Sequence, residues 1–145
     1  MNGITLEMAN MIIAGAFAKA RELGLRPLSV SVLDAGGHLR AFQRQDGASL
    51  SRFHIASGKA GGALALGVSS RAIAEMAVER PTFVTALASA LTQAIVPAPG
   101  GLIVVDADGD FIGAVGVTGD SSDNDELCAL SGIHAAGLAA QGAVQ

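Results

Sequence analysis

Residues 29–42, SVSVLDAGGHLRAF, carry the clearest structural signal in this chain. Ser29–Leu33 is rich in strand-forming residues, Asp34–Gly37 has the composition of a tight turn, and His38–Phe42 returns as a second extended run. Two such runs joined by a short turn pair in antiparallel fashion. The stretch therefore predicts a β-hairpin near the start of the chain.

A second hairpin and several helices are predicted around the first. Leu102–Val105 and Phe111–Val117 flank the turn Asp106–Asp110, and Pro97–Gly101 before them is expected to be a rigid loop. Helical signals mark five further segments, at about residues 6–23, 50–66, 70–80 and 81–94, and from the cap at Asp123 to about residue 140. Helices that separate hairpins in this order predict an α+β fold, with helices packed on an antiparallel sheet.

The ends of these helices carry recognisable capping residues. Thr5 is expected to cap the first helix and Gly24 to end it. Asp123, with Glu126 three residues later, predicts an acidic capping box at the last helix. One face of that last helix is expected to carry Leu127, Leu130 and Leu138.

Length and composition predict one domain, residues 1–145, that assembles with copies of itself. Half of the residues are apolar, only 15% are charged, and the mean hydropathy is +0.48. This excess of apolar residues indicates surface buried between subunits of a homo-oligomer. A monomer with an alanine-rich core is the alternative.

The same numbers argue against several kinds of partner. A net charge of −4, with neither Trp nor Tyr, argues against nucleic acid. No stretch reaches the roughly 18 uninterrupted apolar residues of a membrane span. The single Cys128 excludes an intrachain disulfide and fits a reducing compartment, so we expect a cytoplasmic protein.

Charge is strongly segregated along the chain. All nine Lys and Arg residues lie at or before Arg80, whereas seven of the thirteen acidic residues lie between Asp106 and Glu126. The formal charge is therefore +3 for residues 1–80 and −7 for residues 81–145. Carboxylates without a local cation repel one another. We expect Lys59 or Arg44, from this subunit or a neighbour, to meet the acidic segment and line a cavity with it.

Several segments together resemble the GlcG/HbpS-like family, often labelled haem-degrading, which includes the C-terminal domain of some corrinoid adenosyltransferases. The matching segments are VLDAGGHL (32–39), RQDGA (44–48), KA (59–60), PGG (99–101), GAVGVTG (113–119) and DE (125–126). The resemblance implies profilin-like α/β/α layers around a five-stranded antiparallel sheet, and a homo-oligomer. The residues predict only four clear strands, so a fifth is expected near Ile95–Ala98 or elsewhere.

Two residues depart from the family pattern. His54 stands where such sequences often carry an acidic residue, and Thr118 replaces a more usual serine. A histidine can act as a general acid or base near neutral pH, or ligate haem iron. A surface or interface histidine is the alternative for His54. We expect His38 to be exposed and His134 to lie in the core or at an interface.

The remaining site candidates are cations, carboxylates and tight turns. Lys59 and Glu126 join His54 as candidate catalytic residues. Arg52 lies seven residues before Lys59 on one helix face, and the planar guanidinium of Arg44 suits a carboxylate. The candidate ligand-binding residues are Arg44, Arg52, Gly100, Gly101, Thr118, Gly119 and Asp125. Solvated cations, helix caps and strand-end turns are the alternatives for these residues.

No metal site is predicted. The three histidines and the single cysteine have none of the spacings of a zinc site. Asp106–Asp110 begins like a calcium loop, but an apolar strand follows it instead of the closing glutamate, so a hairpin turn is the better interpretation.

Three functions fit these observations. The first is an oligomeric protein that binds a small carboxylate-bearing ligand, for which the resemblance suggests haem or another tetrapyrrole. The second is a cofactor-independent isomerase, lyase or hydrolase acting on a small oxo- or hydroxy-acid catabolic intermediate. In it His54 would move a proton while Arg44 and Lys59 hold substrate charge. The third is an accessory subunit without a ligand.

Overall fold

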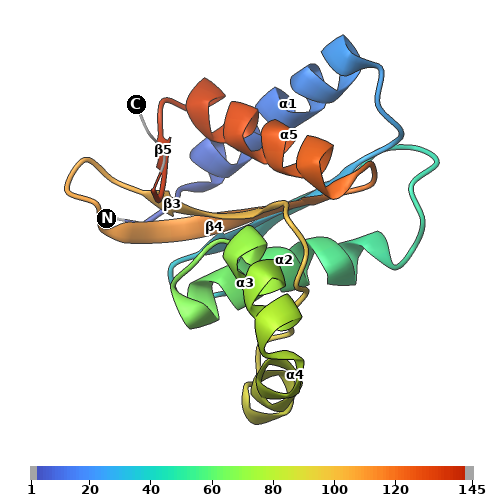
Figure 1. Ribbon diagram of the computed structural model, residues 1–145. Helices are drawn as coiled ribbons and strands as arrows, with labels where there is room; N and C mark the ends of the chain where they lie inside the picture. Colours follow the sequence, from blue (N-terminus) through green and yellow to red (C-terminus); the bar gives the residue numbers. More distant parts are fainter. Residues whose placement is uncertain (1–2, 143–145) are drawn as a thin grey trace.

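A five-stranded antiparallel sheet lies between two layers of helices (Figure 1). The computed structural model describes residues 3–142. The strands are β1 (Ser29–Asp34), β2 (Leu39–Arg44), β3 (Gly101–Val105), β4 (Phe111–Thr118) and β5 (Ala139–Ala140), in the spatial order β2-β1-β4-β3-β5. The helices are α1 (Leu6–Leu23), α2 (Arg52–Leu66), α3 (Ser70–Glu79), α4 (Pro81–Ala90) and α5 (Ser122–Ala135). The predicted α+β fold with a five-stranded antiparallel sheet is confirmed.

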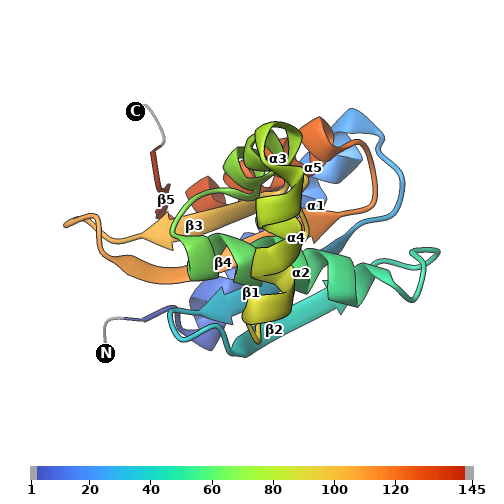
Figure 2. The same cartoon turned by 60° about the horizontal axis from the view of Figure 1, so that its bottom comes forward.

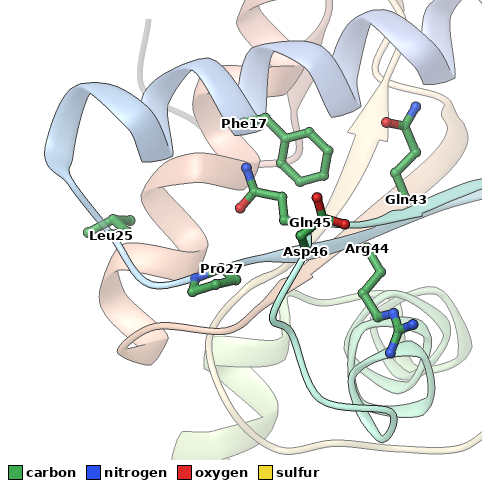
Figure 3. A pocket seen from close by; sticks show the side chains of 7 residues that line it. All are labelled: Phe17, Leu25, Pro27, Gln43, Arg44, Gln45 and Asp46. Atoms are coloured by element: carbon green, nitrogen blue, oxygen red, sulfur yellow. The ribbon is translucent and has the colours of Figure 1, made fainter.

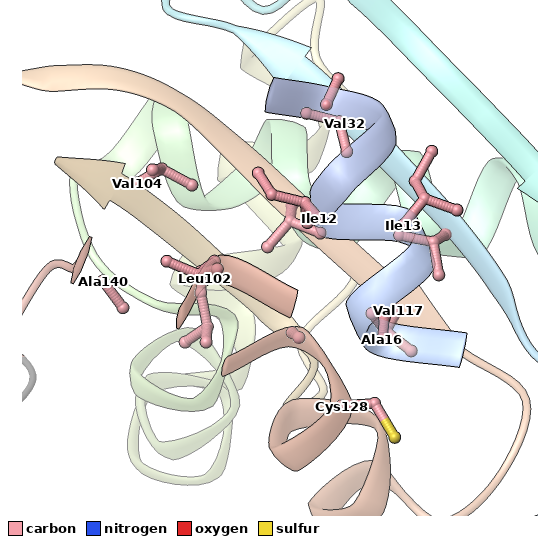
Figure 4. Packing of buried hydrophobic residues seen from close by; sticks show 14 of the residues in the cluster. Ile12, Ile13, Ala16, Val32, Leu102, Val104, Val117, Cys128 and Ala140 are labelled. Atoms are coloured by element: carbon pink, nitrogen blue, oxygen red, sulfur yellow. The ribbon is translucent and has the colours of Figure 1, made fainter. Parts of the chain in front are cut away.

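The hydrophobic core lies between the sheet and the layer formed by α1 and α5. Alternate residues of the central strands point toward this layer, so that Val32, Val104 and Val117 pack against Ile12 and Ile13 of α1 (Figure 4). Cys128 of α5 is buried in the same core.

The helix α2 covers the opposite face of the sheet at unusually close range. Gly101 of β3 and Gly116 of β4 lie on this face, and a Cβ atom at either position would collide with a backbone carbonyl of α2. The glycines therefore allow backbone-to-backbone packing where larger side chains would separate the layers. The segment after α4 returns across the outer side of α2, where Val96 contacts Gly58 and Ile95 contacts Gly62.

The predicted caps of α1 are confirmed, whereas the last helix differs from prediction at both ends. The hydroxyl of Thr5 accepts from Met8 N–H, and Gly24 ends α1 in the left-handed conformation, at φ 63°. The N-cap of α5 is Ser121, whose hydroxyl accepts from Asn124 N–H, so the predicted capping box of Asp123 and Glu126 is wrong.

The fifth strand is not at residues 95–98. The chain leaves α5 at Ala135, and Ala139–Ala140 pairs with the edge of β3, so the prediction of a helix to residue 140 is wrong as well. The helix α4 also stops earlier than predicted, at Ala90 instead of Ala94.

The side of α5 that carries Leu127 differs from expectation. Leu127 is exposed, and Leu138 lies beyond the end of the helix, so the three leucines do not form one helix face. His134 is exposed too, so the core position offered for it is wrong, whereas an interface position stays a prediction. The buried positions are instead mostly small residues that let α5 approach α1 closely; Gly132 packs against the backbone of Ile12.

The acidic hairpin between β3 and β4 forms the expected turn. The carboxylate of Asp106 accepts from the N–H groups of Asp108 and Asp110, each at 2.9 Å. Such side-chain-to-backbone bonds are characteristic of tight turns with aspartate at the first position. Among residues 3–142, no helix has the length and apolar character needed to cross a membrane.

Candidate functional site

A buried ion pair joins the cationic helix to the acidic segment. Lys59 of α2 donates from Nζ to Asp125 Oδ2 of α5 at 3.2 Å and to the carbonyl of Val117 at 2.9 Å. Lys59 is only 2% exposed and Asp125 only 1%. The pair connects helices that cover opposite faces of the sheet. The expected approach of Lys59 to the acidic segment is therefore observed.

Burial works against both charges of this pair. Loss of hydration lowers the pKa of Lys59, and the nearby carboxylate of Asp125 opposes that shift. Burial likewise raises the pKa of Asp125, against the influence of Lys59. Each charge is therefore tolerated in the interior because the other lies beside it.

Gly100, just before β3, and Gly101, its first residue, pack closely against Lys59. A Cβ atom at Gly100 would lie 2.9 Å from Lys59 Nζ, and one at Gly101 would collide with the carbonyl of Lys59. Gly100 also has a φ of 130°, which favours glycine. In this chain Gly100 and Gly101 therefore make room for Lys59 and the backbone of α2.

The turn between β4 and α5 is held by a chain of hydrogen bonds. Asp125 Oδ1 accepts from Asp120 N–H at 2.9 Å. Asp120 in turn accepts from the side chain of Asn124 at 2.8 Å and from both the backbone and the guanidinium of Arg26. These bonds, led by that of Asn124, hold the pKa of Asp120 well below its usual range. Gly119 packs against the backbone of Pro27 and Leu28 at the same turn.

Arg52, at the start of α2, lies beside Thr118 at the end of β4. It donates from Nη1 to Thr118 Oγ1 at 2.9 Å. The hydroxyl of Thr118, buried at the end of β4, is thus used by the protein itself, while Arg52 stays partly exposed. The structure therefore brings together seven of the predicted site residues: Arg52, Lys59, Gly100, Gly101, Thr118, Gly119 and Asp125.

Glu126 is held by a cation that the sequence reasoning missed. Arg71 at the start of α3 donates from Nε to both carboxylate oxygens of Glu126, each at 3.1 Å, and its Nη2 contacts Asp123. These two bonds to Glu126 help raise the pKa of Arg71, after the larger influence of Asp123. The surplus of acidic residues predicted a nearby cation, but nothing in the sequence singled out Arg71 over Lys59 or Arg44.

His54 lies on α2 beside a cavity that neither Lys59 nor Asp125 lines. This cavity of about 240 Å³ lies between α2, the β1–β2 hairpin and the segment after α4. Leu33, Leu39 and Phe53 give it apolar walls, and the exposed imidazole of His54 packs edge-on against Phe53, with ring centroids 5.3 Å apart. Ser57, Gly58, Gln93 and Ala94 are among the other lining residues.

Arg44 lies apart from both the Lys59–Asp125 pair and the cavity of His54. It lines a hollow of about 490 Å³ between α1, the α1–β1 loop and the end of β2. Figure 3 shows its guanidinium pointing away from Phe17, and it donates to the carbonyl of Ala48 at 3.3 Å. Within residues 3–142 it forms no ion pair, so neither Asp46 nor the acidic segment is its partner.

The other histidines lie outside these cavities. His38 is 83% exposed, as expected, and its Nδ1 lies 3.4 Å from Asp34. His134 lies on the exposed side of α5. Of the three histidines, His54 is the one that lines one of these cavities.

Comparison with known proteins gives consistent matches over most of the chain. The family model described as "Haem degrading protein HbpS-like" matches residues 4–134. An uncharacterized 15.0 kDa protein from the dhaT-dhaS intergenic region of Citrobacter freundii is 36% identical over 126 residues, 87% of each chain.

Two crystal structures share the fold over nearly their whole length. A complex of PduOC with heme has a TM-score of 0.84 and 25% identity, covering 96% of this chain and 99% of that chain. The Klebsiella pneumoniae protein ORFY has a TM-score of 0.83 and 30% identity, covering 94% of this chain and 92% of that chain.

Proposed function

Because the chain belongs to the HbpS-like family, we propose that it is an oligomeric protein that binds haem or another carboxylate-bearing tetrapyrrole. The observation that supports this most directly is the exposed imidazole of His54 beside a cavity with partly apolar walls. The similarity to PduOC, which was crystallised with heme, supports it as well. The single cysteine, buried and unpaired, supports a cytoplasmic location.

The residues at this cavity fit a haem in their chemistry. A histidine nitrogen is a common axial ligand of haem iron, and Leu33, Leu39 and Phe53 offer apolar surface to a macrocycle. The volume of about 240 Å³ covers part of such a ligand, so a second copy of the chain would cover the rest. When bound, haem supplies a redox-active iron; the chain supplies the ligand nitrogen and the apolar walls.

The cations have different roles in this proposal. Arg52 uses one nitrogen on Thr118 and has further N–H groups for a carboxylate, whereas Arg44 lines a separate hollow and not the cavity of His54. Lys59 donates two of its three N–H groups to Asp125 and Val117, and its burial keeps it away from a ligand. We therefore assign Lys59 a positioning role, in which it fixes α2 and with it the place of His54.

Titration with haemin tests the proposal. We expect a saturable shift of the Soret band with the wild type, a loss of that shift in His54→Ala, and its retention in His134→Ala. His134 is the matched control because it is an exposed helical histidine away from the cavity. A shift that does not saturate, or one that is equal in wild type and His54→Ala, would refute the proposal.

The size of the cavity favours one second candidate, a cofactor-independent enzyme for a small oxo- or hydroxy-acid. About 240 Å³ is below the roughly 300–1,000 Å³ typical of sites for larger ligands. His54 would move the proton, but neither Lys59 nor Arg44 lines this cavity, so the amide of Gln93 would have to meet the substrate. Chemical-shift changes of His54 with pyruvate, lactate or glycolate, without any Soret change with haemin, would favour this candidate.

A further inference from the structure

The helix α4 projects from the domain as an arm. Figures 1 and 2 show it beyond α3, on the side away from the sheet, and its principal contacts are with α3. Val84 is the only one of its ten residues that is buried. The helix α3, from which the arm projects, is fixed at its start, where Ser70 binds the backbone of Gly101 and Arg71 binds Glu126.

This arm carries no charge. From Pro81 to Val105 the sequence contains neither an acidic nor a basic residue. Exposed helices in water normally carry charged residues on the side away from the core. A ten-residue helix is also too short to be stable in water through its own hydrogen bonds. An exposed, uncharged and short helix is therefore expected to gain its stability from a partner.

We propose that α4 docks against α4 of a second copy of this chain in an antiparallel pair. This inference rests on the oligomeric part of the proposed function and assigns it a surface. Two copies, each with a net charge of −4, repel one another overall. The uncharged arm is where they can approach at the lowest electrostatic cost.

Charge complementarity at the helix ends favours this partner. Arg80 immediately precedes α4, and its guanidinium lies 4.0 Å from the centre of the Phe83 ring. In an antiparallel pair, each Arg80 lies beside the C-terminal end of the other helix, where the carbonyl dipoles are negative. The side of α4 opposite Val84 bears residues such as Thr82, Ala86 and Ser89, which allow two helices to approach closely.

The experiment compares identical substitutions on two exposed helical positions. Ala86 lies on the proposed interface and Ala14 on the exposed side of α1. In sedimentation-equilibrium measurements, Ala86→Glu is expected to raise the dissociation constant of the assembly about tenfold or more, because it buries two like charges. Ala14→Glu is expected to leave it unchanged. Circular dichroism checks that both variants are folded.

A cross-linking measurement tests the same contact without disturbing it. Because Cys128 is buried, a cysteine introduced at Ala86 is the only accessible thiol among the described residues. Ala86→Cys is expected to form a disulfide-linked dimer under mild oxidation, and Ala14→Cys is not. A monomeric wild type overturns both this inference and the proposed oligomer. An oligomer that survives Ala86→Glu and gives no Ala86→Cys cross-link overturns this inference alone.

Discussion

Removing the charge of Lys59 should be far more costly than removing that of any surface cation. Lys59→Met keeps the length of the side chain and therefore its packing against Gly100 and Gly101. It leaves the Asp125 carboxylate, 1% exposed, with no cation, and it leaves the carbonyl of Val117 without its ammonium donor. Loss of one partner of a buried pair costs about 3–5 kcal/mol. That is a large part of the roughly 5–15 kcal/mol that stabilises a typical domain.

Urea unfolding followed by far-UV circular dichroism measures this cost, since the chain has neither Trp nor Tyr for fluorescence. The control is Lys19→Met, which removes an exposed pair with Glu22 and should cost about 0.5 kcal/mol or less. The double variant Lys59→Met/Asp125→Asn should be more stable than Lys59→Met alone, because it removes the uncompensated charge. A cost below about 1 kcal/mol for Lys59→Met, or strict additivity in the double variant, would show that Lys59 does not compensate the buried charge of Asp125.

Three further predictions concern Asp120, the glycines and the cysteine. The pKa of Asp120 is depressed in the folded state, so its contribution to stability is present above its unfolded pKa of about 3.9 and is lost as the pH falls through the lower folded value. Asp120→Asn should therefore lower the free energy of unfolding at pH 7, by an amount that shrinks below about pH 4; a constant difference across that range would contradict this. Gly116→Ala should cost at least about 3 kcal/mol in urea unfolding, because its Cβ would collide with the carbonyl of Ala56. As a control, Gly24→Ala, at an open helix end with positive φ, should cost only about 1 kcal/mol. Equal costs for Gly116→Ala and Gly24→Ala would argue against close packing of α2 on the sheet. Burial raises the pKa of Cys128 to about 11. A thiol reagent at pH 8 should therefore react slowly with the folded protein and rapidly with the protein unfolded in urea. Fast reaction of the folded protein would show that the core around Cys128 is open to the reagent.

The fold could be predicted wherever the signal is local. The hairpin of Ser29–Phe42 needs only strand-forming residues and a turn, and the ends of α1 need only Thr5 and Gly24. The strand β5 could not be predicted, because two alanines have no pattern of their own and pair only because the chain returns beside β3. The exposed side of α5 was misjudged because the helix buries small residues, among them Ala129 and Gly132, rather than its leucines.

The site could be predicted only in part, for a related reason. The separation of charges along the chain indicated that Lys59 or Arg44 would meet the acidic segment, and Lys59 lies against Asp125. The charge pattern could not show which cation binds Glu126 or that Arg44 has no ion-pair partner among the described residues. Arg71 reaches Glu126 because the start of α3 lies near α5, and Arg44 stays apart because β2 is the edge strand on the far side of the sheet. The burial of Lys59, which turns a candidate contact residue into a positioning one, appears only in the folded chain.

Rescue of a variant that lacks the imidazole tests haem binding at His54 more directly than any other measurement. We expect that His54→Gly shows no Soret shift with haemin, and that added imidazole restores the wild-type spectrum by entering the space left at the cavity. A His54→Gly variant whose ferric spectrum matches the wild type without imidazole would contradict it.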